Sequence, residues 1–225
     1  MLLFEKVKTM LKLIMLNDLF LDQNFNTDNS NHVHLVIHPF YTTNVDKKTN
    51  NRYATQIYLD TIYSYIGTKL EENAKLIVFQ EESKIEDLET QFTVFNDNRI
   101  WYVKTTTGEA TPIFKNGWKQ FCEILLKNNI QSATISGLFL VNMSIKDAKN
   151  NYEGKYDKGG IQPEFIQKRE QYIEQFPMAR GWLKMNFVPT GCVGFAIMNL
   201  LKYGIDVDIS EQTAPCSKYE ILQTD

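Results

Sequence analysis

The sequence predicts a three-layer αβα (Rossmann-like) fold, in which helices cover both faces of a mainly parallel β-sheet. Short apolar runs typical of buried strands alternate with longer segments of helical periodicity along most of the chain. A helix between two consecutive strands is the usual crossover of a parallel pair. The 225 residues, 43% hydrophobic and 23% charged, suit one ordinary globular domain with additions.

Residues 1–31 are predicted to add an N-terminal amphipathic helix and a polar linker to this domain. Lysines interrupt the apolar residues of the helix, so no run reaches the length of a membrane span, and no cleavage site of a targeting segment follows. We expect the helix to pack on the domain or on a second copy of the chain, and therefore expect a homodimer. Its apolar face consists of Leu3, Val7, Met10, Leu11, Ile14 and Met15.

Residues 32–225 are predicted to form the single α/β domain, which opens with a strand, helix, strand unit. The first strand covers Val33–Ile37 and ends before a proline, which cannot donate to a ladder. Apolar residues then recur at helical spacing over Tyr53–Leu70, and Ala74–Phe79 forms the second strand. A short acidic helix is expected at Ser83–Phe92.

The same alternation continues to the end of the domain. We expect a strand at Ile100–Lys104, a helix at Ile113–Lys127 and a strand at Ser132–Val141. A last helix begins near Cys192, stops at Gly204, and is followed by the strand Ile205–Ile209.

One segment, residues 142–182, breaks this alternation and is interpreted as an insertion. It contains a polar loop and a charged helix at about Pro163–Gln175, with the proline in the first turn. Either the whole segment loops out before Cys192, or Leu183–Val188 is a strand that leads into this cysteine. Because ligands bind outside the carboxyl ends of strands in open α/β sheets, we expect the insertion there, as a lid or a dimer contact.

Three residues with chemical potential are predicted to converge at the carboxyl edge of the sheet. His38 follows the first strand, Lys104 ends the third, and Cys192 opens the last long helix. A helix start and a nearby cation favour the thiolate, imidazole can exchange a proton, and the amides of the first helical turn can receive an oxyanion. This combination suits acyl transfer to and from a cysteine.

Each of the three residues also has a structural interpretation. A free cysteine often packs as a small hydrophobe, so Cys192 fits a core position as well. His38 would then be a loop residue that bonds to backbone groups, and Lys104 would end a strand.

Two other groups of polar residues are left outside the predicted site. His32 and His34 alternate along a strand and share a face, but no third ligand is nearby, so we expect no metal. Glu81 and Glu82 follow a strand end, where adjacent carboxylates usually face water.

Composition and motifs exclude several classes of function. A net charge of -3 gives no field that attracts nucleic acid, and aromatic residues are not interleaved with basic ones. No glycine-rich phosphate loop lies between a strand and a helix, so we expect no cofactor. The 3 cysteines have no paired spacing, which indicates a reducing compartment, and we expect a cytoplasmic protein with a small-molecule substrate.

Four segments of the chain resemble the isochorismatase-like cysteine hydrolases. They read HLVIHPF, WYVKTTTGEATPIF, KQFCEILLKNNIQSATISGLFL and GCVGFAIMNLLKYGIDVDIS, and the resemblance covers about two thirds of the chain. It implies a parallel sheet between helices and hydrolysis of a small amide or ester through a cysteine. The family uses an aspartate after the first strand, a lysine and a cysteine, and the resemblance places the last two at Lys104 and Cys192.

The chain departs from the family pattern in two places. His38 stands where the family has its aspartate, and the insertion separates Gly137 from Cys192, which a short turn joins in the family. The resemblance therefore leaves two expectations. One is a cysteine hydrolase, and the other is a catalytically inactive domain of the same fold that binds a protein or a small ligand.

Overall fold

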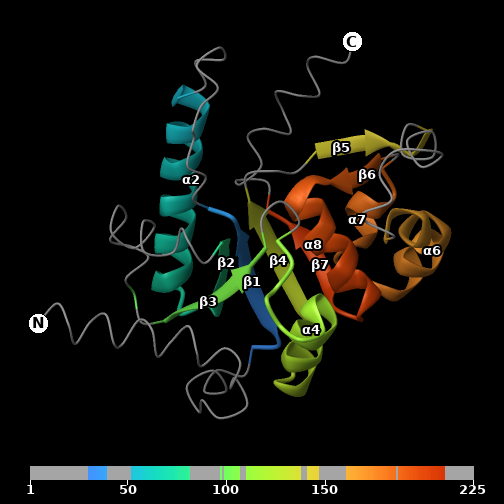
Figure 1. The fold of residues 1–225 in the computed structure, drawn as a ribbon, viewed down its shortest axis with the longest axis horizontal. Helices are drawn as coiled ribbons and strands as arrows, with labels where there is room; N and C mark the ends of the chain where they lie inside the picture. Colours follow the sequence, from blue (N-terminus) through green and yellow to red (C-terminus); the bar gives the residue numbers. More distant parts are fainter. Residues whose placement is uncertain are drawn as a thin grey trace, which may run out of the picture.

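The main feature of the molecule is a parallel sheet with strand order β3-β2-β1-β4-β7. The computed structural model describes residues 30–39, 52–81, 97, 99–106, 110–137, 141–146, 161–185 and 187–210. All neighbouring strands of this sheet run parallel, as predicted (Figure 1). The strands are β1 (His32–Ile37), β2 (Leu76–Glu81), β3 (Ile100–Thr105), β4 (Ser132–Gly137) and β7 (Asp206–Ile209).

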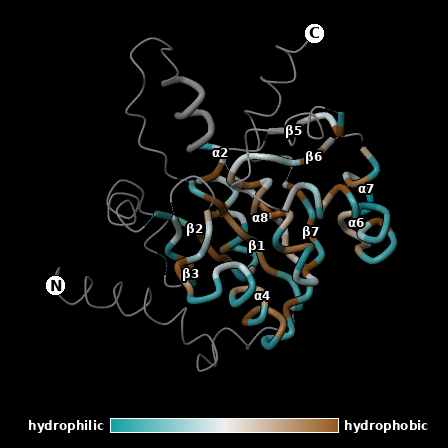
Figure 2. The backbone as a smooth tube through the Cα atoms, turned by 45° about the vertical axis from the view of Figure 1, so that its right-hand side comes forward, coloured by the Kyte–Doolittle hydropathy of each residue, from teal (hydrophilic) through white to brown (hydrophobic). Residues whose placement is uncertain are grey.

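Helices cover both faces of the sheet, which confirms the predicted three-layer fold. The helix α2 (Arg52–Glu71) packs on one face, where Ile62 and Ile66 join a cluster with alternate residues of β1, β2 and β3. On the other face α4 (Gly117–Lys127) and α8 (Gly191–Lys202) enclose a larger cluster. The apolar residues of β1 lie between the layers, and polar residues occur on the outer helices (Figure 2).

The order of the strands reverses between β1 and β4. From β1 the chain moves outward through β2 and β3, and then returns to place β4 and β7 on the other side. The next described helix after β1 is α2, on one face of the sheet, whereas α8 packs beside β4 on the other face. The carboxyl edge at such a switch point is where open α/β sheets bind their ligands. His38 follows β1 and Gly137 ends β4, so these two residues border the switch point.

The inserted segment enters and leaves through a pair of short antiparallel strands. They are β5 (Val141–Ser144) and β6 (Phe187–Thr190), and they form a separate sheet. The strand that leads into Cys192 is thus β6, later in the chain than the expected Leu183–Val188 and outside the main sheet. The insertion also contains α6 (Ile161–Gln175), with Pro163 in its first turn as predicted, and α7 (Arg180–Leu183).

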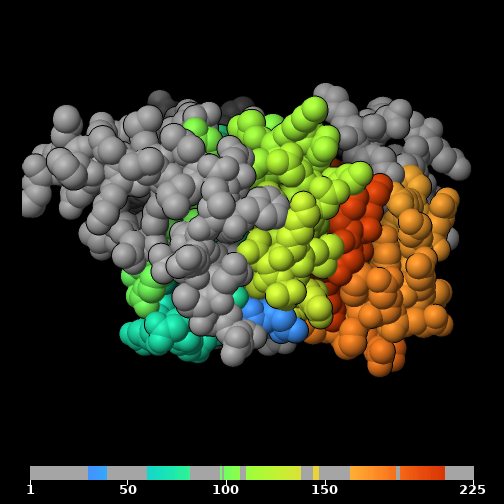
Figure 3. Space-filling model, turned by 90° about the horizontal axis from the view of Figure 1, so that it is seen from below, coloured from blue at the N-terminus to red at the C-terminus, as the bar shows by residue number. Residues whose placement is uncertain are grey.

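The described part of the insertion packs beside α8 and the outer strand β7. Phe165 and Phe176 of this segment join the α8 cluster, and the ammonium of Lys202 lies 2.5 Å from a carboxylate oxygen of Glu164. The indole of Trp182 donates to the carbonyl of Val207, at 2.9 Å, so α7 covers the edge of the sheet. Figure 3 shows α8 in red between α4 and α6. The expected lid or dimer contact stays a prediction, because residues 147–160 lie outside the described residues.

Several predicted boundaries differ from the structure. The helix expected from Ile113 begins at Gly117, because Pro112 is held in a bridge with Thr105 and Gly117 has a φ of 48°. The strand expected over Ser132–Val141 ends at Gly137. The acidic helix at Ser83–Phe92 and the N-terminal helix lie outside the described residues. Within the described ranges, no helix is long and apolar enough to cross a membrane.

Candidate functional site

A tight turn from β6 into α8 places Cys192 in the first helical turn. Thr190, the residue before the helix, is extended, and Gly191 follows with a φ of 74°, a conformation that glycine adopts without strain. A Cβ on Gly194 would overlap the backbone of Pro189, whose carbonyl oxygen would lie 2.7 Å away. The two glycines therefore let the strand cross close over the start of the helix.

The first turn of α8 lies against the carboxyl ends of β1 and β4. A Cβ on Gly137 would overlap a methyl group of Val193 and would lie 2.7 Å from the carbonyl oxygen of Ile37. Cys192 is 3% exposed and belongs to the cluster between the sheet, α4 and α8. The side chain of Thr190 makes no capping hydrogen bond at this helix start. The N–H groups of a first helical turn are the groups that bind an anion or a developing oxyanion.

His38 occupies a strained backbone position at the end of β1. Its φ is 48°, in the left-handed region, and a following proline normally restricts a residue to extended conformations. The backbone N–H donates to the carbonyl of Phe79 at 2.8 Å, and Nε2 lies 2.8 Å from Oγ1 of Thr105. The side chain is buried. Such strain costs about 1–3 kcal/mol and persists where surrounding contacts hold it, as at many functional sites. Asn73, Ala110 and Asn129 also have a positive φ.

The structure brings two of the three predicted residues to the same face of the sheet. Alternation along β3 groups Thr105 with Val103, on the face of α4 and α8, so His38 reaches toward the face on which Cys192 packs. Lys104 alternates with Tyr102 instead, which lies in the α2 cluster. The side chain of Lys104 is half-buried. It leaves the backbone on the α2 face of the sheet, opposite Cys192, although both residues lie at the carboxyl edge.

Sequence reasoning missed Thr105 and placed Glu81 outside the site. These residues end β3 and β2, pair in register, and are both buried. Alternation groups Glu81 with Phe79, whose side chain lies in the α4 and α8 cluster. A carboxylate is therefore directed to the face that holds His38 and Cys192. The only feature of the sequence that could have pointed to Thr105 and Glu81 was their position at strand ends, which does not predict whether a side chain is buried.

His32 and His34 lie on the α2 face and are held by hydroxyl groups. The ring nitrogens of His32 lie 2.8 Å from Oγ of Ser132 and 3.0 Å from Oγ1 of Thr134. Nδ1 of His34 lies 2.7 Å from the hydroxyl of Tyr65. Burial lowers the pKa of both histidines, that of His34 to about 4. In the described part of the chain, no group of three or more His, Cys, Asp or Glu side chains is arranged to hold a metal ion.

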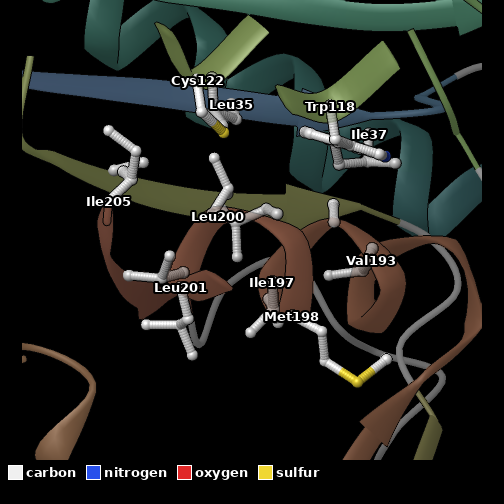
Figure 4. Packing of buried hydrophobic residues seen from close by; sticks show 14 of the residues in the cluster. Leu35, Ile37, Trp118, Cys122, Val193, Ile197, Met198, Leu200, Leu201 and Ile205 are labelled. Atoms are coloured by element: carbon white, nitrogen blue, oxygen red, sulfur yellow. The ribbon is translucent and has the colours of Figure 1, made fainter. Parts of the chain in front are cut away.

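Cys122 gives an internal comparison for the candidate nucleophile. It lies in the middle of α4, where its sulfur points toward Leu35 (Figure 4). Burial raises the pKa of its thiol far above the ordinary range, so Cys122 stays protonated and unreactive. Cys192 differs from it by its place at a helix start and at the carboxyl edge of the sheet.

The arrangement places a thiol, an imidazole and a carboxylate at one edge of a Rossmann-like sheet. Comparison of the whole chain with protein-family models, with curated proteins and with solved structures gave no match.

Proposed function

We propose that the chain is an isochorismatase-like cysteine hydrolase that acts on a small amide or ester. One observation carries this proposal. Cys192, in the first turn of α8, and His38, at the end of β1, are both buried beside the β1/β4 switch point, and the imidazole contacts Thr105, which alternation assigns to the face of Cys192. The resemblance of the four sequence segments supports the same reaction class.

In the first half of the reaction, the thiolate sulfur of Cys192 attacks the carbonyl carbon of the substrate. The carbonyl electron pair moves to oxygen, and the N–H groups of the first turn of α8 bind the oxyanion. When this intermediate collapses, the C–N or C–O bond breaks. The leaving amine or alcohol takes a proton from the imidazolium of His38, and a thioester on Cys192 remains.

In the second half, the neutral imidazole of His38 takes a proton from water. The resulting hydroxide attacks the thioester carbonyl, the C–S bond breaks, and the acid leaves with the thiolate of Cys192 restored. Because Thr105 holds Nε2, we assign the proton transfer to Nδ1 of His38. No cofactor takes part in these steps.

Two charged residues complete the proposed site. Glu81 supplies a carboxylate from the neighbouring strand and favours the imidazolium form of His38. It would replace the family's aspartate, since His38 stands at that position in this chain. Lys104 supplies the positive charge that favours the thiolate. It starts from the other face of the edge, so its effect on Cys192 is expected to be weaker than that of a contacting cation.

The alternative is an inactive domain of the same fold that binds a protein or a small ligand. The burial of Cys192 among apolar side chains favours it, because such a thiol behaves as a small hydrophobe. The two functions differ in the chemistry of this thiol, which makes it the property to measure.

The test is a screen of small amides and esters with the wild type, Cys192→Ala and Cys122→Ala. We expect Cys192→Ala to abolish turnover and Cys122→Ala to retain it, since Cys122 lies away from the carboxyl edge. Alkylation by iodoacetamide, followed by mass spectrometry of the two peptides, measures both thiols in one sample. If the chain is a hydrolase, iodoacetamide should alkylate Cys192 rapidly at a pH well below the usual thiol pKa of about 8.5. Lys104→Ala should slow this alkylation.

Equal rates of hydrolysis by the wild type and Cys192→Ala would exclude a hydrolase that uses Cys192 as its nucleophile. Slow alkylation of Cys192 that Lys104→Ala does not change would favour the binding domain.

A further inference from the structure

The indole N–H of Trp118 is a buried donor without an acceptor. Trp118 is 4% exposed, and its Nε1 is the buried side-chain nitrogen or oxygen that lacks a hydrogen-bond partner in the described part of the chain. Leaving such a donor unpaired costs about 1–3 kcal/mol, and buried indoles usually find a partner. Trp182 shows the usual arrangement, because its Nε1 donates to the carbonyl of Val207.

The position of Trp118 connects it with the proposed site. Its ring stacks on Phe79, with centroids 5.1 Å apart and planes within 12°, and Phe79 pairs in register with Ile37. The carbonyl of Phe79 accepts the backbone N–H of His38. Trp118 thus lies over the last residues of β1 and β2, on the face that holds Cys192.

Figure 4 shows how the indole is directed. Trp118 lies beside Ile37, at the end of the cluster where α8 begins, and Val193 lies opposite on the first turn of that helix. Cys122 and Leu35 lie toward the other end. The nitrogen lies on the side of the ring that is near Ile37 and away from Leu35, which is the side nearer the carboxyl edge.

We propose that the indole N–H of Trp118 donates to an acceptor atom in the acyl part of the substrate. Trp118 is then a specificity-determining residue: substrates with an ether, hydroxyl or carbonyl oxygen near the scissile carbonyl satisfy the donor, whereas alkyl chains of the same length leave it unpaired. A site that contains a dedicated donor discriminates in this way because the poor substrate leaves a buried polar group without a partner. This inference rests on the hydrolase function proposed above.

The first experiment observes the donor directly and needs no turnover. The chain has 3 tryptophans, so ¹⁵N-labelled protein gives three indole N–H signals, and Trp118→Phe identifies the one from Trp118. The Cys192→Ala protein is titrated with methoxyacetamide and with butyramide, which have the same length and differ in one ether oxygen. We expect methoxyacetamide to move the Trp118 proton signal downfield, butyramide to leave it in place, and the Trp182 signal to stay constant with both.

The second experiment measures selectivity with 4-nitrophenyl methoxyacetate and 4-nitrophenyl butyrate. The ratio of the two kcat/KM values should fall by about 2- to 10-fold in Trp118→Phe, the effect of one hydrogen bond. Trp182→Phe is the matched control, because it removes an indole whose N–H already has a protein acceptor. It should leave the ratio unchanged while it lowers stability. Taking the ratio cancels the different intrinsic reactivities of the two esters.

The outcomes separate this inference from the proposed function. An unchanged ratio in Trp118→Phe, with turnover that still requires Cys192, would overturn the inference and leave the hydrolase standing. A Trp118 signal that is already downfield and cross-relaxes with water in the free protein would also overturn it, since a buried water would then hold the donor. Turnover that does not require Cys192 would overturn the hydrolase, and the titration would still report whether Trp118 binds the ether oxygen.

Discussion

Nε2 of His38 lies 2.8 Å from the hydroxyl oxygen of Thr105, across the intervening strand β2. This contact fixes the imidazole at the end of β1, where the backbone is in the left-handed region. Thr105→Val keeps the shape of the side chain and removes the oxygen. We expect a loss of about 1–3 kcal/mol of stability, because Nε2 of a buried imidazole loses this hydrogen bond, and we expect lower kcat. Urea unfolding and the kinetics of the best substrate measure the two effects, and an unchanged kcat would show that Thr105 does not position His38.

His38 itself separates the proposed mechanism from a structural role. His38→Ala should lower kcat/KM by about 10²–10⁴-fold, the usual effect of losing one proton-transfer group. His38→Asp introduces the residue type implied by the family resemblance and should keep or raise activity if the site has that geometry. A His38→Asp protein that folds and is as inactive as Cys192→Ala would contradict the assignment.

Glu81 should shape the pH dependence of the reaction. Glu81→Gln keeps the size and removes the charge, so the imidazolium of His38 loses the carboxylate that favours it. The pKa of the group seen in the profile of kcat/KM against pH should therefore fall in the variant. Lys104→Ala is the comparison on the opposite face of the edge and should change thiol alkylation more than this profile. A profile that Glu81→Gln does not move would exclude the carboxylate from the site.

Gly194 is required by the close crossing of β6 over α8. A Cβ at this position would overlap Pro189, so Gly194→Ala must displace the strand that leads into Cys192. We expect a loss of more than about 1 kcal/mol of stability and a changed rate of Cys192 alkylation. Gly67→Ala is the control in α2, where a Cβ meets nothing within 4 Å, and it should stabilise the protein by about 0.5–1 kcal/mol. Equal stability of the two variants would contradict the tight turn.

The histidine pair on the α2 face predicts a loss of stability in mild acid. Burial, and then the charge of His32, lower the pKa of His34 to about 4, whereas the unfolded chain has the ordinary value of 6.5. The unfolded state therefore binds more protons between pH 6.5 and 4, and the free energy of unfolding falls as the pH falls through this window. Urea unfolding at several pH values should show a smaller decrease in His34→Phe. A decrease of the same size in both proteins would assign the effect to other groups.

Assembly is predicted from the sequence alone. The apolar face of the N-terminal helix should join two copies, so light scattering at micromolar concentration should give the mass of a dimer. Leu11→Asp places a charge on that face and should give a monomer, whereas Lys8→Gln should not. A monomeric wild type whose N-terminal segment resists proteolysis would show that the helix packs within its own chain.

The sequence was most informative where burial follows a simple period. The strands from Val33 and Ile100 and the helix from Cys192 were placed to within about two residues, because their apolar residues recur with the period of a strand or helix. The pair β5 and β6 was missed, since each strand has only four residues and their pairing spans the insertion.

The site was only partly predictable for a related reason. His38 and Cys192 were singled out because their residue types carry chemistry and each follows a strand, and the structure places both after strand ends. The positive φ of His38 goes against the usual effect of a following proline, and only tertiary contacts hold it. Thr105 has no chemical signature of its own, and the burial of Glu81 depends on elements that pack from other parts of the chain.

The antiparallel pair at the base of the insertion has a consequence for how the chain folds. Strand β7 joins the sheet beside β4 only after the chain has passed through the whole insertion, so this pairing must close a large loop. If β5 pairs with β6 before β7 docks, the two ends of that loop are already close, and the remaining closure is short. We therefore infer that refolding slows when this pair is weakened, even where the native contacts of α8 and β7 are unchanged, because the rate depends on the order in which loops close.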